Sequence, residues 1–206
     1  MSDVKLSVIY YSATSSVYTL AEKAVEAAEK AGAEVRLRKV KELAPAEAIA
    51  SNEGWSAHAR STESVLEATA DDVVWADAVM FGTPTRYGNV AAQLKQFFDT
   101  LGPQWGAGQL ADKVYTGFTS TGTNHGGQES TLLAMYNSFY HFGGIIVPPG
   151  YTDPSKFVDG NPYGASHISQ NGARPPQDED LTAVAYSATR AVQVAARLKA
   201  GTAASL

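Results

Sequence analysis

Hydroxyl groups are concentrated in one short segment near the start of the chain. Ser12, Thr14, Ser15 and Ser16 follow the apolar run 6–9 and precede a helical pattern, with no Lys or Arg among them. Backbone N–H groups at a helix N-terminus, together with the helix dipole, favour a bound anion. We therefore predict a site for the phosphate of a mononucleotide, held by hydrogen bonds and dipoles. Its predicted residues are Ser12, Ala13, Thr14, Ser15, Ser16 and Val17.

A second polar loop, 82–89, follows the apolar run 78–81. Glycines at both of its ends permit tight turns, and a proline stiffens the approach. Thr85 can face a flat polar ring, Arg86 can place positive charge beside an electron-rich ring, and Tyr87 can stack on it. A rigid turn with an exposed arginine is the alternative interpretation. The predicted binding residues are Pro84, Thr85, Arg86, Tyr87, Gly88 and Asn89.

A third loop, 120–129, is rich in glycine and small polar residues. Glycines let backbone N–H groups approach a ligand closely, although such a loop can also be only a flexible turn. The loop lacks the lysine of the P-loop that binds nucleoside triphosphates. It also lacks the glycine spacing of the motif that binds dinucleotides. The predicted binding residues are Ser120, Thr121, Gly122, Thr123, Asn124, Gly126 and Gly127.

Two further side chains are candidates for chemistry or substrate contact. His141 lies near the end of a helical pattern and can act as a donor or acid, because the pKa of a histidine lies near neutral pH. A packing histidine is the alternative interpretation. Trp105 is flanked by glycines, which is unusual for a core aromatic and indicates a lid or a subunit contact.

Strand and helix patterns alternate along the chain, which predicts a doubly wound α/β sheet with right-handed crossovers. Such sheets bind ligands at the carboxyl ends of their strands, so the three loops should meet there. A glycine-rich connection at 151–176 is expected to be functional or an interface. The predicted strands are 4–10, 34–40, 78–82, 114–119 and 145–147, and the predicted helices are 17–28, 89–101, 128–142 and 178–199.

The composition narrows the classes of function. The 206 residues, which we expect to form one domain, carry a net charge of −5, and this argues against a nucleic-acid-binding protein. The chain has no cysteine and its four histidines are widely separated, so we expect no metal site. No apolar stretch is long enough for a membrane span and no leader is recognisable, which makes a cytoplasmic location the expectation.

The three loops, in this order, resemble the WrbA family of NAD(P)H:quinone oxidoreductases, historically named tryptophan-repressor-binding proteins. The most specific match is 82–89, and segments 120–123, 126–129, 146–148 and 162–165 are also similar to that family. The resemblance implies a flavodoxin-like, five-stranded parallel sheet of order 2-1-3-4-5 with an extended loop after strand 5. It also implies one FMN per chain, NADH or NADPH as co-substrate, quinone as substrate and a homotetramer.

The same resemblance assigns roles to the candidate residues. Segment 12–17 matches the phosphate loop with Thr14 near the nicotinamide, 85–87 the residues beside the isoalloxazine, and 120–127 the loop on its other side. His141 matches a histidine near the flavin, and Trp105 an aromatic that covers the quinone pocket. The expected reaction is a ping-pong, two-electron reduction of quinones. A one-electron flavodoxin carrier and a non-enzymatic regulatory protein are the alternatives.

Overall fold

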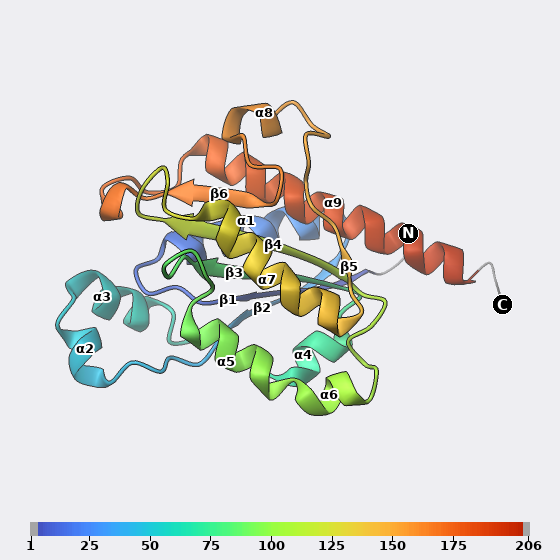
Figure 1. Cartoon of the computed structure of the whole chain (residues 1–206), viewed down its shortest axis with the longest axis horizontal. Coiled ribbons are helices and arrows are strands. Elements are labelled where there is room, and N and C mark those ends of the chain that lie inside the picture. Colours follow the sequence, from blue (N-terminus) through green and yellow to red (C-terminus); the bar gives the residue numbers. More distant parts are fainter. Residues whose placement is uncertain (1–3, 204–206) are drawn as a thin grey trace.

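A parallel β-sheet forms the centre of the computed structural model, which describes residues 4–203. Its strand order is β2-β1-β3-β4-β5, so the predicted flavodoxin-like topology is confirmed (Figure 1). A further strand, β6, pairs with β4 and was not predicted. The strands are β1 (Lys5–Tyr10), β2 (Glu34–Lys39), β3 (Ala78–Pro84), β4 (Val114–Thr121), β5 (Ile145–Ile146) and β6 (Ala165–Ile168).

Helices cover both faces of the sheet, because apolar side chains alternate between the two faces along β1, β3 and β4. Leu6, Val8 and Met80 belong to the core beneath α1 (Ser16–Lys30) and α9 (Asp178–Ala203). Ile9 and Phe81 belong to the opposite core, beneath α4 (Ala70–Trp75), α5 (Ala92–Thr100) and α7 (Gln128–Phe142). Figure 1 shows the sheet between these two helical layers.

Several predicted boundaries hold because local signals fix them. Gly32 and Gly143 follow α1 and α7 with φ of 90° and 73°, a left-handed conformation that ends a helix and suits glycine. The helix predicted at 128–142 has these bounds in the structure.

Other boundaries were wrong. The helix predicted at 89–101 begins later, at Ala92 of α5, since Asn89 exchanges two backbone hydrogen bonds with Arg86 in a turn. Gly102 and Pro103 begin a further short helix that was not predicted, α6 (Gly102–Gly106), because proline fits the first turn of a helix. The connection after β2 holds α2 (Ala46–Ala50) and α3 (Glu53–Ser61) as well as α4.

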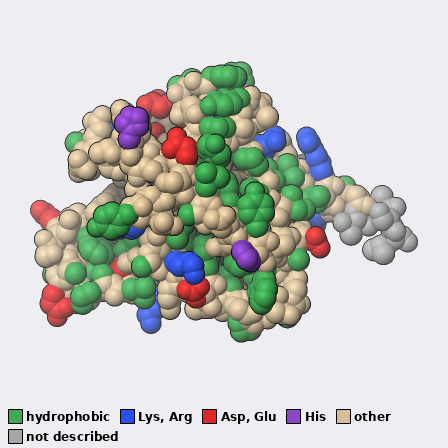
Figure 2. Space-filling model, viewed as in Figure 1, with side chains coloured by type: hydrophobic (Ala, Val, Ile, Leu, Met, Phe, Trp, Pro, Cys, Tyr) green, Lys and Arg blue, Asp and Glu red, His purple; other side chains and the backbone are tan. Residues whose placement is uncertain are grey.

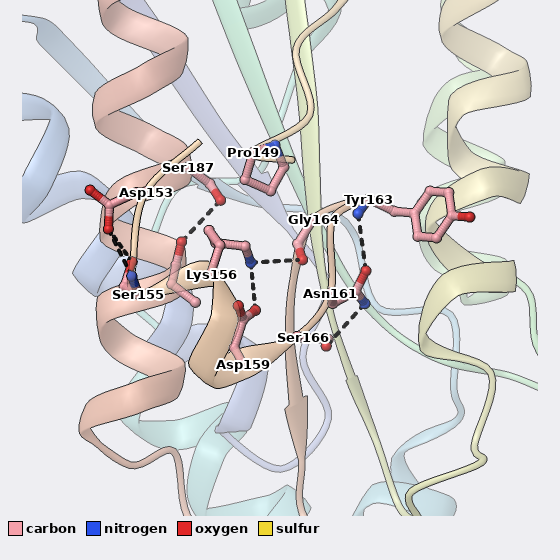
Figure 3. A network of polar contacts seen from close by, with 12 residues as sticks. Pro149, Asp153, Ser155, Lys156, Asp159, Asn161, Tyr163, Gly164, Ser166 and Ser187 are labelled. Atoms are coloured by element: carbon pink, nitrogen blue, oxygen red, sulfur yellow. Dashed lines mark hydrogen bonds and ion pairs between the residues drawn. The ribbon is translucent and has the colours of Figure 1, made fainter. Parts of the chain in front are cut away.

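The second long connection, after β5, is ordered by a buried ion pair (Figure 3). Lys156 and Asp159 begin and end α8 (Lys156–Asp159), and their side chains, 0% and 2% exposed, approach to 2.5 Å. The Lys156 ammonium also lies 3.5 Å from the Gly164 carbonyl oxygen, just before β6. This pair therefore anchors the chain where it enters β6. A 3-10 turn, η1 (Gln170–Gly172), follows that strand.

Candidate functional site

The three predicted loops meet at one cavity of about 130 Å³ at the carboxyl edge of the sheet. The surface is hollowed on this side of the molecule, between the segment that follows β6 and the α2–α3 connection (Figure 2). Most of its lining residues were predicted from the sequence. The lining comprises Ser12, Ala13, Thr14, Ser16, Val17, Pro84, Thr85, Arg86, Ser120, Thr121, Gly122 and Ser169.

The first loop presents the N-terminus of α1 to this cavity. Ser15 precedes the helix with φ of 75°, and no side chain caps the first turn. That turn also contains no acidic residue, so no protein carboxylate competes for its N–H groups. Uncapped N–H groups beside the hydroxyls of Ser12, Thr14 and Ser16 form a donor set that suits a phosphate.

The second loop is a tight turn stabilised by hydrogen bonds among its own residues. The backbone groups of Arg86 and Asn89 pair with each other, and the Thr85 hydroxyl accepts from the Gly88 N–H at 3.1 Å. Tyr87 stands at the tip of the turn, 104% exposed and with a left-handed φ of 53°. The Arg86 guanidinium donates to the Thr85 carbonyl, which places one cation at the rim of the cavity.

The third loop is bonded to the second, so the two loops form one wall. The Thr85 N–H donates to the Ser120 carbonyl at 2.9 Å, and the Thr131 hydroxyl donates to the Thr85 hydroxyl at 2.8 Å. A Cβ on Gly127 would lie 2.8 Å from the Cα of Gly88, so glycine is required where these backbones meet. Thr123 and Asn124 accept hydrogen bonds through their carbonyls from Gln128, and they do not line the cavity.

The sequence reasoning missed the residues that support the third loop from β6. The His167 imidazole lies 2.9 Å from the Ser120 hydroxyl, and the Ser169 N–H donates to the Thr121 carbonyl at 2.8 Å. Asn171 donates through its N–H to the Gly122 carbonyl. These residues lie in a segment whose glycine and proline content indicated a loop. The four positions of β6 alternate between buried and half-buried, but their residue types do not alternate between apolar and polar, so the strand had no clear signal in the sequence.

His141 and Trp105 do not lie at this cavity within one protomer. They contact each other, since the Trp105 indole N–H donates to the His141 carbonyl at 2.7 Å. α7 begins beside the third loop and ends at Phe142, about 20 Å further along its axis. The strand that follows α7, β5, pairs with the start of β4. The two residues therefore lie toward the opposite edge of the sheet.

A second cavity, of about 140 Å³, lies on the other side of the first loop. Glu42 lines it and accepts hydrogen bonds from Tyr11, Trp55 and Gln93, which fix the carboxylate. Burial opposes the charge of Glu42, but the hydrogen bonds from Gln93, Tyr11 and the backbone N–H groups of Leu43 and Ala44 hold its pKa below the usual value. The sequence reasoning did not predict this cluster, because its members come from four separate segments of the chain.

Comparison with known proteins shows the family. The model of the NADPH-dependent FMN reductase family matches residues 4–156. The chain belongs to this family. An NAD(P)H dehydrogenase (quinone) of Deinococcus radiodurans is 42% identical over 196 residues, covering 95% of this chain and 97% of that protein. A protein of the same name from Syntrophobacter fumaroxidans is 38% identical over 202 residues, covering 95% and 98%.

Solved structures show the same fold at lower sequence identity. A WrbA-like flavodoxin protein from Agrobacterium tumefaciens superposes with a TM-score of 0.67 at 24% identity, covering 95% of this chain and 99% of that one. The apo form of an NADH:FMN oxidoreductase has a TM-score of 0.62 at 17% identity, covering 93% and 89%. Family membership confirms the predictions of an enzyme and of FMN with NAD(P)H as electron donor.

The residues at the cavity fit a singly phosphorylated cofactor. The uncapped start of α1 and its hydroxyls suit the phosphate, while Pro84–Arg86 and Ser120–Gly122 offer backbone and hydroxyl groups along an adjoining wall. Within residues 4–203, no cluster of three or more His, Asp or Glu side chains could hold a metal ion. In the same range, no helix is long and apolar enough to cross a membrane.

Proposed function

We propose that the protein is a WrbA-type NAD(P)H:quinone oxidoreductase that reduces quinones by two electrons in a ping-pong reaction. The observation that carries this proposal is the cavity where an uncapped helix N-terminus meets two polar loops that are hydrogen-bonded to each other. The names of the relatives from Deinococcus and Syntrophobacter support quinone as the acceptor. When bound, FMN supplies the exchange of electron pairs between nicotinamide and quinone.

In this proposal, the residues of the chain bind FMN and orient its ring. Ser12, Thr14 and Ser16 donate hydrogen bonds to the phosphate, while the N–H groups of the first turn of α1 complete its shell. Thr85 and Ser120 hold the two loops together and so fix the wall of the ring site. Arg86 places positive charge beside the electron-rich part of the ring and stabilises negative charge there.

The roles proposed for His141 and Trp105 need a second copy of the chain. Both residues lie toward the edge of the sheet opposite their own cavity, so they can cover only the cavity of a neighbouring protomer. The homotetramer that we propose is supported by large hydrophobic side chains exposed on α7, α8 and the loop after α8. These are Leu133 (46% exposed), Tyr140 (69%), Phe157 (71%), Val158 (72%) and Tyr163 (40%). Figure 2 shows hydrophobic side chains gathered on the face that α7 and α8 occupy.

A titration followed by an assay tests the proposal. The purified chain should take up one FMN per protomer, detected by the flavin absorbance, and should then oxidise NADH or NADPH when benzoquinone is present. Parallel double-reciprocal plots at several quinone concentrations are expected for a ping-pong reaction. FMN uptake without nicotinamide oxidation would favour a one-electron carrier, and a protein that takes up no FMN would favour a regulatory role.

Arg86→Ala tests the one cation that lines the cavity. Charged hydrogen bonds contribute about 1.5–3 kcal/mol, so the change should weaken FMN binding or lower kcat/KM by roughly 10–100-fold. The Arg86 side chain is exposed and bonds only its neighbour's carbonyl, so the fold should persist. Arg190→Ala is the matched control, because that guanidinium donates to the Pro148 carbonyl, and Arg190 does not line the cavity. Equal kinetics for both variants would remove the role of Arg86.

A further inference from the structure

Ser120 is the cavity residue whose hydroxyl is held by a buried histidine. His167 lies on β6 and is 0% exposed, and its Nδ1 atom is 2.9 Å from the Ser120 hydroxyl oxygen. Its other ring nitrogen, Nε2, is 3.0 Å from the carbonyl oxygen of Arg174. The imidazole therefore bridges the wall of the cavity and the segment that leads into α9.

These two contacts fix the tautomer of the imidazole. A carbonyl oxygen can only accept, so Nε2 must carry the proton that is donated to Arg174. In the neutral ring Nδ1 then bears a lone pair and accepts the proton of the Ser120 hydroxyl. The hydrogen of Ser120 is consequently directed at His167, and the two lone pairs of the Ser120 oxygen point away from the imidazole and can accept hydrogen bonds.

The surroundings keep this arrangement in place. Burial lowers the pKa of His167. The Asp180 carboxylate and the hydrogen bond to the Arg174 carbonyl oppose this change, and the Arg174 guanidinium adds to it, so that the pKa stays below the usual value. Arg174 itself is held by Asp180 at 2.7 Å and by Glu179 at 2.6 Å, both in the first turn of α9. The acceptor carbonyl is thus fixed to the end of a long helix, and the ring stays neutral near pH 7.

We propose that His167 is a positioning residue of the cofactor site, which makes the Ser120 hydroxyl a hydrogen-bond acceptor toward the bound mononucleotide. The inference rests on the proposed FMN site. FMN carries donors that such an acceptor can serve, namely the hydroxyls of its ribityl chain and a ring N–H. Without His167 the Ser120 hydroxyl could rotate and present its proton instead, which would repel those donors.

The experiment is a double-mutant cycle on FMN binding. FMN is titrated into the full-length apoprotein at pH 8, and the quenching of flavin fluorescence gives the dissociation constant. In His167→Asn, the amide oxygen lies near the position of Nδ1 and still accepts from the Ser120 hydroxyl. In His167→Gln, the amide keeps the donor to the Arg174 carbonyl, but the acceptor for Ser120 is lost. Since a net hydrogen bond contributes about 0.5–1.5 kcal/mol, His167→Gln should weaken FMN binding roughly 3–10-fold, and His167→Asn less than about 2-fold.

Ser120→Ala separates positioning from a structural role. In a Ser120→Ala protein, His167→Gln should cause no further loss of FMN affinity, because the hydroxyl that it orients is gone. An equal loss in both backgrounds would show that His167 acts only through the fold, and it would overturn the proposal. Wild-type affinity in His167→Gln would overturn it as well. Failure of the wild-type chain to bind FMN would instead overturn the proposed function.

A second measurement needs no variant. The ¹⁵N shifts of the His167 imidazole in the wild-type holoprotein distinguish the two tautomers. We expect protonation at Nε2 and a lone pair at Nδ1 at pH 8. Protonation at Nδ1 would make Ser120 the acceptor of that bond and would overturn the proposal, even if the variants at position 167 fail to fold.

Discussion

The two edges of the sheet are built differently. At the carboxyl edge, three loops and the end of β6 are joined by hydrogen bonds among Thr85, Ser120, Thr131 and His167, and they enclose a cavity. Toward the opposite edge, Trp105 is joined to α7 by a single hydrogen bond and is 56% exposed. The cavity is therefore enclosed by one protomer alone, whereas Trp105 and His141 do not line it.

This difference shows that two residue groups at opposite ends of one helix need not belong to the same site. α7 begins beside the third loop and carries His141 in its last turn, so both of its ends belong to predicted site segments. A helix of this length separates its ends by about 20 Å, and His141 in its last turn does not line the cavity. Substitutions at the two edges should therefore differ in their effects.

Lys156→Met should cause the largest loss of stability at the carboxyl edge. The substitution leaves the buried Asp159 carboxyl without its cation and loosens the entry into β6, so we expect a decrease of about 3–5 kcal/mol in the free energy of unfolding. Urea denaturation measures it. Lys95→Met is the control, because its pair with Asp99 is exposed and should contribute less than about 1 kcal/mol. Similar losses in both variants would contradict the anchoring role of the buried pair.

Gly82→Ala compares close packing at the two edges. A Cβ on Gly82 would lie 2.3 Å from the ring of Phe118, which is fully buried and cannot move aside. We expect a loss of about 1–3 kcal/mol in the free energy of unfolding, with weaker FMN binding. Gly106→Ala in α6 meets no atom within 4 Å and should leave both quantities nearly unchanged. A neutral Gly82→Ala would show that the β3–β4 packing can relax.

Mixed oligomers test whether the opposite edge serves a neighbouring cavity. Arg86→Ala and His141→Ala should each lower quinone reductase activity. If each site uses Arg86 from one copy and His141 from another, co-expression should restore about a quarter of wild-type activity, the share of sites in which both contributors are intact. An activity no higher than the average of the two variants alone would place both residues in the same protomer's site.

A change of pH should produce the smallest effect. Burial lowers the pKa values of His58 and His167 below 6.5, so the unfolded chain binds more protons than the native one as the pH falls through that value. The free energy of unfolding should therefore decrease between pH 7.5 and 5.5. Urea denaturation at both values measures the slope, and His58→Gln should reduce it. A slope unchanged by His58→Gln would show that His58 does not contribute.

The sequence by itself determined the sheet order through the family resemblance, and the main strands and helices through local pattern. The strand at 78–81 and the helix at 128–142 each produce a pattern of apolar residues within one short segment. Such a pattern can be recognised from the sequence without knowledge of distant contacts. The meeting of the three loops at one cavity was also predictable, because a loop that follows a parallel strand must lie at the carboxyl edge of the sheet.

Only the tertiary structure decided how these loops are held. The pairing of β6 with β4 joins residues 165–168 to 118–121, and the sequence of a short, glycine-flanked segment does not reveal such a distant partner. The contacts of His167 and Lys156 depend on that pairing and on burial. Neither can be inferred from the spacing of residues along the sequence. The placement of His141 likewise follows from the length and direction of α7 in space, since residue type alone says nothing about which edge a side chain reaches.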